Sequence, residues 1–235
     1  IPENSDSETC PMIMFIPDST GSGKSAKEIV EQYYGADIWA SDEEQEKHPS
    51  YVLVPAFTET VVDDNFNVSE QVEAAVHLIS DLQNQYSIDK NRLYTTGQSM
   101  GCMTFLILAA KYPELFTACL FVSGQWDINK LTGLIGQKFI YAASNGDDKA
   151  SKGQREVIEM FNKSEVPYVS YQNIDAKNNG IKILNEQPVN FVTFKAKTTL
   201  PEGTKGNYSE HMTSFDYVYK NSEFTNWLLA QTKGE

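Results

Sequence analysis

One pentapeptide constrains the fold of this chain more than any other stretch. Gly97-Gln-Ser-Met-Gly101 follows an apolar run at residues 92–96 that suits a strand, and it opens an apolar run at residues 100–112 that suits a helix and stops before Pro113. A turn this tight needs glycine at both flanking places, because a Cβ there would collide with the neighbouring strand or helix. We therefore expect a strained turn that lifts the Ser99 hydroxyl above the end of a sheet.

Short apolar runs alternate with helical patterns along the whole chain. This alternation predicts an α/β fold with a mostly parallel central sheet and helices on both faces. Strands that are apolar throughout agree with burial on both faces. Two polar stretches, residues 40–48 and 175–210, look like excursions from the pattern. The expected strands are 12–16, 51–54, 92–96, 119–123, 139–144 and 168–174, and the expected helices are 26–33, 72–82, 100–112, 153–161 and 224–231.

The bulk composition narrows the choice of partners. The 235 residues suit one large domain with a substantial core, and the net charge of −13 argues against binding to nucleic acid or to an anionic membrane surface. No apolar run reaches membrane-spanning length, so no transmembrane segment is expected. Asn-x-Ser sequons at Asn67, Asn162 and Asn207 are compatible with a secreted or cell-envelope protein, although such sequons also occur by chance. The oligomeric state stays open.

A nucleophilic serine in such a turn needs a base and a carboxylate that orients the base. In this setting the chain order is serine, acid, histidine. The chain has three histidines, of which His48 and His77 precede Ser99. His211 alone follows it, and we expect His211 to be the base.

The acid should follow a strand between Ser99 and His211. The run at residues 139–144 is such a strand, and after Gly146 it offers the adjacent Asp147 and Asp148. Their side chains must point in different directions, so only one of them can reach the histidine. Asp175, after the next strand, is a third candidate.

The glycine-rich stretch at residues 17–25 ends in Gly-Lys-Ser and resembles a phosphate-binding loop. That motif requires glycine where this chain has Asp18, and Pro17 offers no N–H to a phosphate. We instead expect this turn to supply one N–H of an oxyanion hole, from Ser19 or, as the weaker choice, from Asp18. The second N–H would come from Met100, the residue after the serine.

Five further side chains near these elements bear on the site or on its surroundings. Gln98 and Trp126 are candidates for contact with substrate, although either could simply pack in the core. Cys102 begins the helix after Ser99, whereas Cys10 and Cys119 sit at the other end of their strands, too far away to form a disulfide with Cys102. All three cysteines are therefore expected to be thiols.

The chain resembles the α/β-hydrolase superfamily. The resemblance extends over nearly the whole chain and is carried by residues 91–101, 145–151, 189–194, 210–216 and 227–231. Within the superfamily the match is to bacterial esterase-like proteins of the phospholipase/carboxylesterase or predicted-peptidase type, near the polyhydroxybutyrate depolymerase and prolyl-oligopeptidase branches. The resemblance implies a nucleophile at Ser99 and a base at His211, and it favours Asp147 over Asp148 as the acid.

The chain departs from this family at two places. Relatives carry His-Gly where this chain has Pro17-Asp18, and a second glycine where it has Cys102. Relatives also have two strands before the one expected at residues 12–16. We therefore expect residues 1–235 to be one α/β-hydrolase catalytic domain that lacks the first strands and any upstream N-terminal domain.

The function expected from these residues is hydrolysis of a small carboxylic ester through an acyl-enzyme. No metal or organic cofactor is expected to take part. A serine peptidase of the prolyl-oligopeptidase type is the runner-up. A binding module that keeps the fold without the activity is the alternative from another class.

Overall fold

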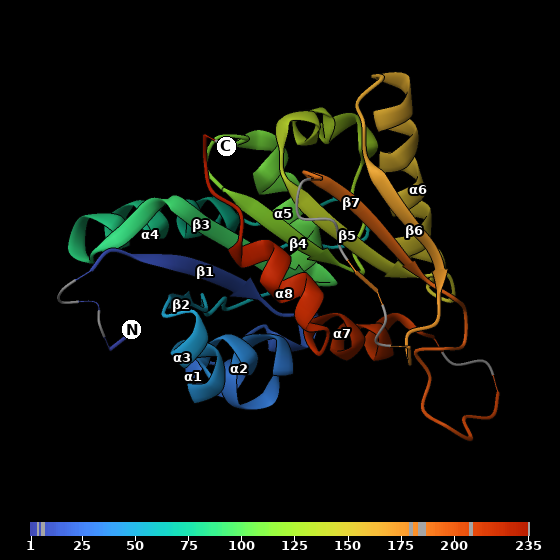
Figure 1. Ribbon diagram of the computed structural model, residues 1–235, viewed down its shortest axis with the longest axis horizontal. Helices are drawn as coiled ribbons and strands as arrows, with labels where there is room; N and C mark the ends of the chain where they lie inside the picture. The colour runs from blue at the N-terminus through green and yellow to red at the C-terminus, as the bar shows by residue number, and fades with distance from the viewer. Residues whose placement is uncertain (4, 6–7, 179–180, 183–186, 207–208, 235) are drawn as a thin grey trace.

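A seven-stranded sheet, parallel throughout, runs through the molecule in the order β2-β1-β3-β4-β5-β7-β6 (Figure 1). The computed structural model describes residues 1–3, 5, 8–178, 181–182, 187–206 and 209–234, so the sequon at Asn207 lies outside the described residues. The strands are β1 (Cys10–Ile16), β2 (Tyr51–Leu53), β3 (Ile88–Gln98), β4 (Ala118–Val122), β5 (Phe139–Ser144), β6 (Val169–Ile174) and β7 (Val189–Phe194). The helices are α1 (Ala26–Gln32), α2 (Tyr34–Ala40), α3 (Asp42–Lys47), α4 (Gln71–Gln85), α5 (Met100–Lys111), α6 (Asp148–Lys163), α7 (His211–Tyr219) and α8 (Ser222–Leu229), with short 3-10 turns at Ser19–Gly21, Ile128–Lys130 and Thr132–Gly136.

Both faces of the sheet are covered by helices. Alternate residues of β1 enter different halves of the core: Met12 and Met14 join the cluster under α4, α5 and α6, whereas Ile13 and Phe15 join the one under α1, α2, α7 and α8. Every residue of β1 is buried, which explains why the strand is apolar throughout. The expected fold class, an α/β-hydrolase fold with helices on both faces, is confirmed.

The stretch at residues 175–210 is more than the polar excursion expected from the sequence. It contains β7, all of whose residues are buried, between β5 and β6. The stretch at residues 40–48 likewise contains the short helix α3. The helices also differ from expectation. Helix α6 begins at Asp148 rather than near residue 153. Helix α7, which begins at His211, was not expected.

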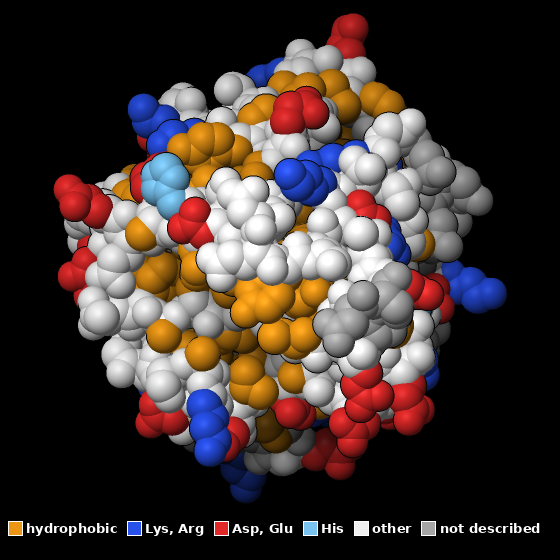
Figure 2. All heavy atoms as spheres, turned by 90° about the vertical axis from the view of Figure 1, so that its left-hand side faces the viewer, with side chains coloured by type: hydrophobic (Ala, Val, Ile, Leu, Met, Phe, Trp, Pro, Cys, Tyr) orange, Lys and Arg blue, Asp and Glu red, His pale blue; other side chains and the backbone are white. Residues whose placement is uncertain are grey.

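The two edges of the sheet differ in exposure. The short strand β2 forms one edge, and β6, half of whose residues are exposed, forms the other. Figure 2 views the side that carries the N-terminus, where hydrophobic side chains gather in the middle of the face and charged ones lie around them. None of the helices within the described ranges is long and apolar enough to cross a membrane.

Candidate active site

Ser99 sits at the sharp turn between β3 and α5. Its φ of 52° and ψ of −113° lie outside the ordinary regions for a side-chain-bearing residue, and hydrogen bonds from Ser99 N to Val122 O (2.9 Å) and from Gly101 N to Pro17 O (3.0 Å) hold the turn. A Cβ on Gly101 would lie 1.9 Å from Ile16 O, and a Cβ on Gly97 would lie 2.6 Å from Gly101 C. Both glycines are therefore required by backbone contacts, as expected from the sequence.

Three side chains far apart in the sequence form one hydrogen-bonded chain. His211 Nε2 lies 2.7 Å from Ser99 Oγ, and His211 Nδ1 lies 2.5 Å from Asp147 Oδ2. Because an ionised carboxylate can only accept, Nδ1 carries the proton and donates it, which leaves Nε2 to accept from the Ser99 hydroxyl. The His211 ring also packs edge-on against Phe215 one turn further along α7, at 5.2 Å between centroids.

The two carboxylate oxygens of Asp147 have separate partners. Oδ1 accepts from Ala150 N at 3.2 Å and caps α6, and Oδ2 faces His211. Asp148 is the first residue of the helix and is exposed, so it is Asp147 that the structure brings to His211. The carboxylate of Asp175 accepts instead from Lys177 N in its own turn.

Glu210, which the sequence analysis did not single out, ties together three segments around the triad. Its side chain is buried, at 2% exposure, and accepts from Ser144 Oγ at 2.9 Å, Thr199 Oγ1 at 2.6 Å and Lys197 N at 2.5 Å. These partners lie at the end of β5 and in the loop after β7, while Glu210 itself precedes His211. The sequence shows only that a glutamate precedes the candidate base. It does not show that this glutamate is buried, so its role could not be predicted.

The turn after β1 lies beside the turn that carries Ser99, because Pro17 O accepts from Gly101 N. The Asp18 carboxylate is 2% exposed and accepts from Thr20 N (2.9 Å), Thr20 Oγ1 (2.5 Å) and Gln98 Nε2 (2.8 Å). Within the described part of the chain, no hydrogen bond engages the amide N–H of Ser19 or of Met100. Both amides are thus available to an anion.

Gln98 and Trp126 do not line the cavity beside Ser99. Gln98 is 5% exposed, and its amide group is used in the bond to Asp18. Trp126 is also 5% exposed, and its ring packs edge-on against Phe66 at 5.1 Å between centroids. The structure therefore places both as supports of neighbouring loops.

The Gly-Lys-Ser stretch begins a helix without the geometry of a phosphate loop. Ser25 caps α1, with its Oγ accepting from Glu28 N at 3.3 Å while Ser25 N donates to Glu28 Oε2 at 2.8 Å. Lys24 is exposed. The Ser25 hydroxyl thus caps its own helix.

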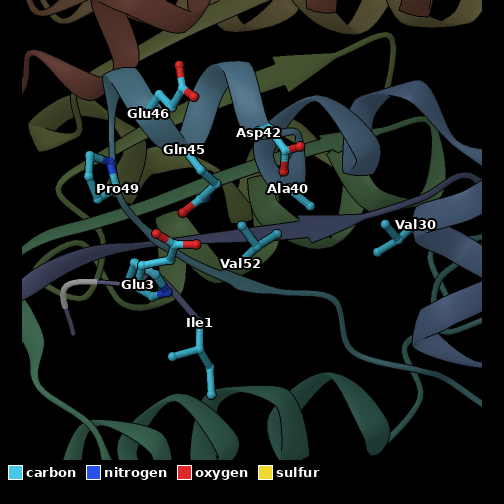
Figure 3. Close-up of a pocket in the computed structure, with 10 residues that line it drawn as sticks. Ile1, Glu3, Val30, Ala40, Asp42, Gln45, Glu46, Pro49 and Val52 are labelled. Carbon is cyan, nitrogen blue, oxygen red and sulfur yellow. The ribbon is translucent and has the colours of Figure 1, made fainter. Parts of the chain in front are cut away.

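The triad opens into a cavity of about 580 Å³. It is lined by Asp64, Ser99, Met103, Gln125, Gly146, Asp147, Asp148, Lys149, Ser209 and His211. A larger cavity of about 820 Å³ lies between the N-terminal segment, α3 and β2 (Figure 3), but it contains no residue of the triad. We take the smaller one as the candidate site because it holds the reactive side chains.

The cysteines and acidic groups do not suggest a different chemistry. All three cysteines are buried thiols. Across the described ranges, no group of three or more His, Cys, Asp and Glu side chains is arranged to hold a metal ion.

Residues 58–184, more than half of the chain, match the protein family described as "Putative esterase". The chain belongs to this esterase family. A sequence search of curated proteins found no significant match.

Solved structures similar to this chain share its fold. A thermostable esterase superposes with a TM-score of 0.80 at 21% identity, over 99% of this chain and 58% of its own chain. A fluorophosphonate-binding serine hydrolase of Staphylococcus aureus (TM-score 0.58, 12% identity, 96% of this chain and 86% of its own) and an S-formylglutathione hydrolase of Agrobacterium tumefaciens (0.54, 11%, 97% and 87%) are more distant. This chain thus spans little more than half the length of the thermostable relative.

Proposed function

We propose that this esterase hydrolyses carboxylic esters through an acyl-enzyme formed on Ser99. The observation that carries the proposal is the unbroken chain of contacts from Ser99 Oγ to His211 Nε2 (2.7 Å) and from His211 Nδ1 to Asp147 (2.5 Å). Membership of an esterase family supports the same reaction class.

Each residue of the chain has a separate part in the reaction. His211 takes the Ser99 proton as Oγ attacks the ester carbonyl, and Asp147 holds the imidazolium that forms. The imidazolium then protonates the leaving alcohol, and a water molecule hydrolyses the acyl-enzyme by the same route.

The developing negative charge on the carbonyl oxygen needs donors that are already in place. The amide N–H of Met100 at the start of α5 and that of Ser19 after β1 are the two candidates. The N-terminal end of α5 adds its favourable dipole for an anion.

Replacement of the nucleophile tests the proposal directly. We expect Ser99→Ala to lower the turnover of 4-nitrophenyl acetate by ~10⁴-fold or more. Ser164→Ala, at the end of α6, is the matched control and should turn over normally. Near-normal turnover by the Ser99→Ala variant would refute the assignment.

Two further experiments distinguish an ester hydrolase from an inactive binding module and from a peptidase. A fluorophosphonate probe should label the wild type at Ser99, and His211→Ala should abolish labelling, whereas His77→Ala, on the exposed face of α4, should not. A panel of esters run beside peptide substrates of similar size distinguishes an esterase from a peptidase. Cleavage of the peptides at rates above those of the esters would overturn the ester assignment.

A further inference from the structure

Three polar side chains in the wall of the active-site cavity bind one another. Lys149 Nζ lies 2.5 Å from Asp64 Oδ2, and Gln125 Nε2 donates to Asp64 Oδ1 at 2.7 Å. All three line the same cavity as Ser99 and His211. They come from three different segments, so the tertiary fold brings them together.

Asp64 is presented by a well-braced hairpin, residues 61–69. Val62 and Val68 form an antiparallel bridge, and the Asp63 carboxylate accepts from Asn67 N at 3.1 Å and from Asn67 Nδ2 at 2.9 Å. Phe66, at the tip with a φ of 63°, packs its ring on the buried Trp126. The hairpin therefore holds the Asp64 carboxylate in a defined place.

The other two members are fixed by α6. Lys149 is the second residue of that helix and lies two residues after Asp147. Gln125 packs closely against the helix, because a Cβ on Gly153 would lie 2.3 Å from Gln125 Cβ. The triad acid Asp147, Lys149 and Gln125 are thus all positioned by helix α6.

The group lies in the wall of the cavity that also contains His211 and Asp147, and Lys149 follows Asp147 by two residues at the start of α6. His211 helps to lower the pKa of Asp64, after the larger effect of the Lys149 hydrogen bond, and the charge of Asp147 contributes to the raised pKa of Lys149. Both effects agree with the position of the group in the same cavity wall as the His–Asp pair. Because His211 must protonate the leaving alkoxide, the alcohol part of an ester lies on this side of Ser99.

The hydrogen-bonding groups of these three side chains suit a ligand with hydroxyl groups better than one with an aliphatic chain or a negative charge. The Lys149 ammonium has two further N–H donors, and among the described residues no hydrogen bond engages the carbonyl oxygen or the second N–H of the Gln125 amide. A hydroxyl both donates and accepts, so it can bind either one. An aliphatic chain would have to desolvate the ion pair, and Met103 is the only apolar side chain among the described residues that line the cavity. An anion would meet the carboxylates of Asp64 and Asp148.

We propose that Asp64, Gln125 and Lys149 form a subsite for a neutral, polyhydroxylated alcohol, such as a sugar or polyol, in the ester that this protein cleaves. The proposal rests on the proposed ester hydrolysis at Ser99. The subsite would act through binding, by hydrogen bonds to hydroxyls beyond the ester oxygen.

The test compares two acetyl esters of the same shape. We expect kcat/KM for 6-O-acetylglucose to exceed that for cyclohexylmethyl acetate, whose ring lacks hydroxyls. Lys149→Met should lower kcat/KM for the sugar ester by about 10-fold, mostly through KM, because a hydrogen bond to a charged group is lost. Gln125→Leu should act in the same direction. Lys152→Met, on the same helix but paired with Glu156, is the matched control and should keep the wild-type preference.

Either of two results would overturn the subsite. One is a wild-type preference for cyclohexylmethyl acetate, and the other is an unchanged ratio of the two esters in Lys149→Met and Gln125→Leu. The affinity of the Ser99→Ala variant for each ester, measured by NMR titration, tests the subsite without turnover. Tighter binding of the sugar ester supports it, and equal or weaker binding refutes it. Failure of the catalytic proposal would appear separately, as turnover that survives the loss of Ser99.

Discussion

The carboxylate of Glu210 occupies the space that a side chain on Gly146 would need. A Cβ on Gly146 would lie 1.8 Å from Glu210 Oε1 and 2.3 Å from its Cδ. Glu210 cannot move aside cheaply, because three hydrogen bonds hold its buried carboxylate. The glycine before Asp147 and the glutamate before His211 therefore fit together directly beneath the acid and the base.

We expect Gly146→Ala to lower the free energy of unfolding by ~1–3 kcal/mol, as overpacking does, and to reduce ester turnover at least several-fold. The physical reason is that a displaced Glu210 moves both Asp147 and His211. Urea denaturation and kcat measurements check the two effects. Gly136→Ala is the matched control, because a Cβ there would meet nothing within 4 Å. A Gly146→Ala variant as stable and active as the wild type would contradict this interpretation.

We expect Gln98→Leu to reduce kcat by ~10-fold or more with a smaller effect on KM. The substitution removes a hydrogen bond to the buried Asp18 carboxylate, which holds the turn that carries the Ser19 amide. Gln154→Leu provides the comparison, because this buried glutamine bonds to Tyr141 O and Val192 O away from the triad. It should cost stability while kcat stays near normal. Equal losses of kcat in both variants would indicate a general structural effect.

The three cysteines should resist thiol reagents in the folded protein. Burial raises the pKa of the Cys119 thiol to about 12, and it raises the pKa of Cys102 further and that of Cys10 as well. Since the thiolate is the reactive form, we expect no rapid reaction with Ellman's reagent in buffer and reaction of all three thiols in urea. Rapid labelling of Cys102 without denaturant would show that the core beneath Ser99 opens.

The Asp64–Lys149 pair should make a small, pH-dependent contribution to stability. The hydrogen bond from Lys149 holds the pKa of Asp64 in the folded protein below its usual value. The stabilisation is therefore present above the pKa of Asp64 in the unfolded chain, and it is lost as the pH falls through the pKa of Asp64 in the folded protein. Because the pair is more than half exposed, its contribution is screened and should be at most ~0.2–1 kcal/mol. Urea denaturation of the wild type and Asp64→Asn between pH 6 and pH 2 checks this. The difference between the two proteins should shrink in acid and in high salt, and a difference that grows in acid would contradict it.

Local features of the sequence were enough to predict which three side chains meet at the candidate site. The turn at Ser99 depends on two glycines whose contacts are within the strand–turn–helix unit, apart from the close approach to Ile16. His211 was assigned because the other two histidines precede the serine. The choice between Asp147 and Asp148 depended on where α6 begins, and an aspartate that caps a helix is visible in the sequence only if that boundary is known.

Features that depend on long-range contacts were not predictable in the same way. β7 lies in a stretch that is polar on average, and its place inside the sheet is set by pairing with β5 and β6. Glu210 and Asp64 are ordinary acidic residues until the fold supplies their partners. Gln98 was considered for contact with substrate because it adjoins Ser99, but its side chain turns toward Asp18.

The position of β7 affects how the protein can be made on the ribosome. Residues 169–174 are synthesised before residues 189–194, yet their only neighbour in the sheet is that later strand. While the chain emerges, β6 therefore lacks its native neighbour, and His211 emerges later still. A nascent chain that stalls before residue 189 would expose the unpaired edge of β5 to other chains, and it would lack the His211 of the candidate site.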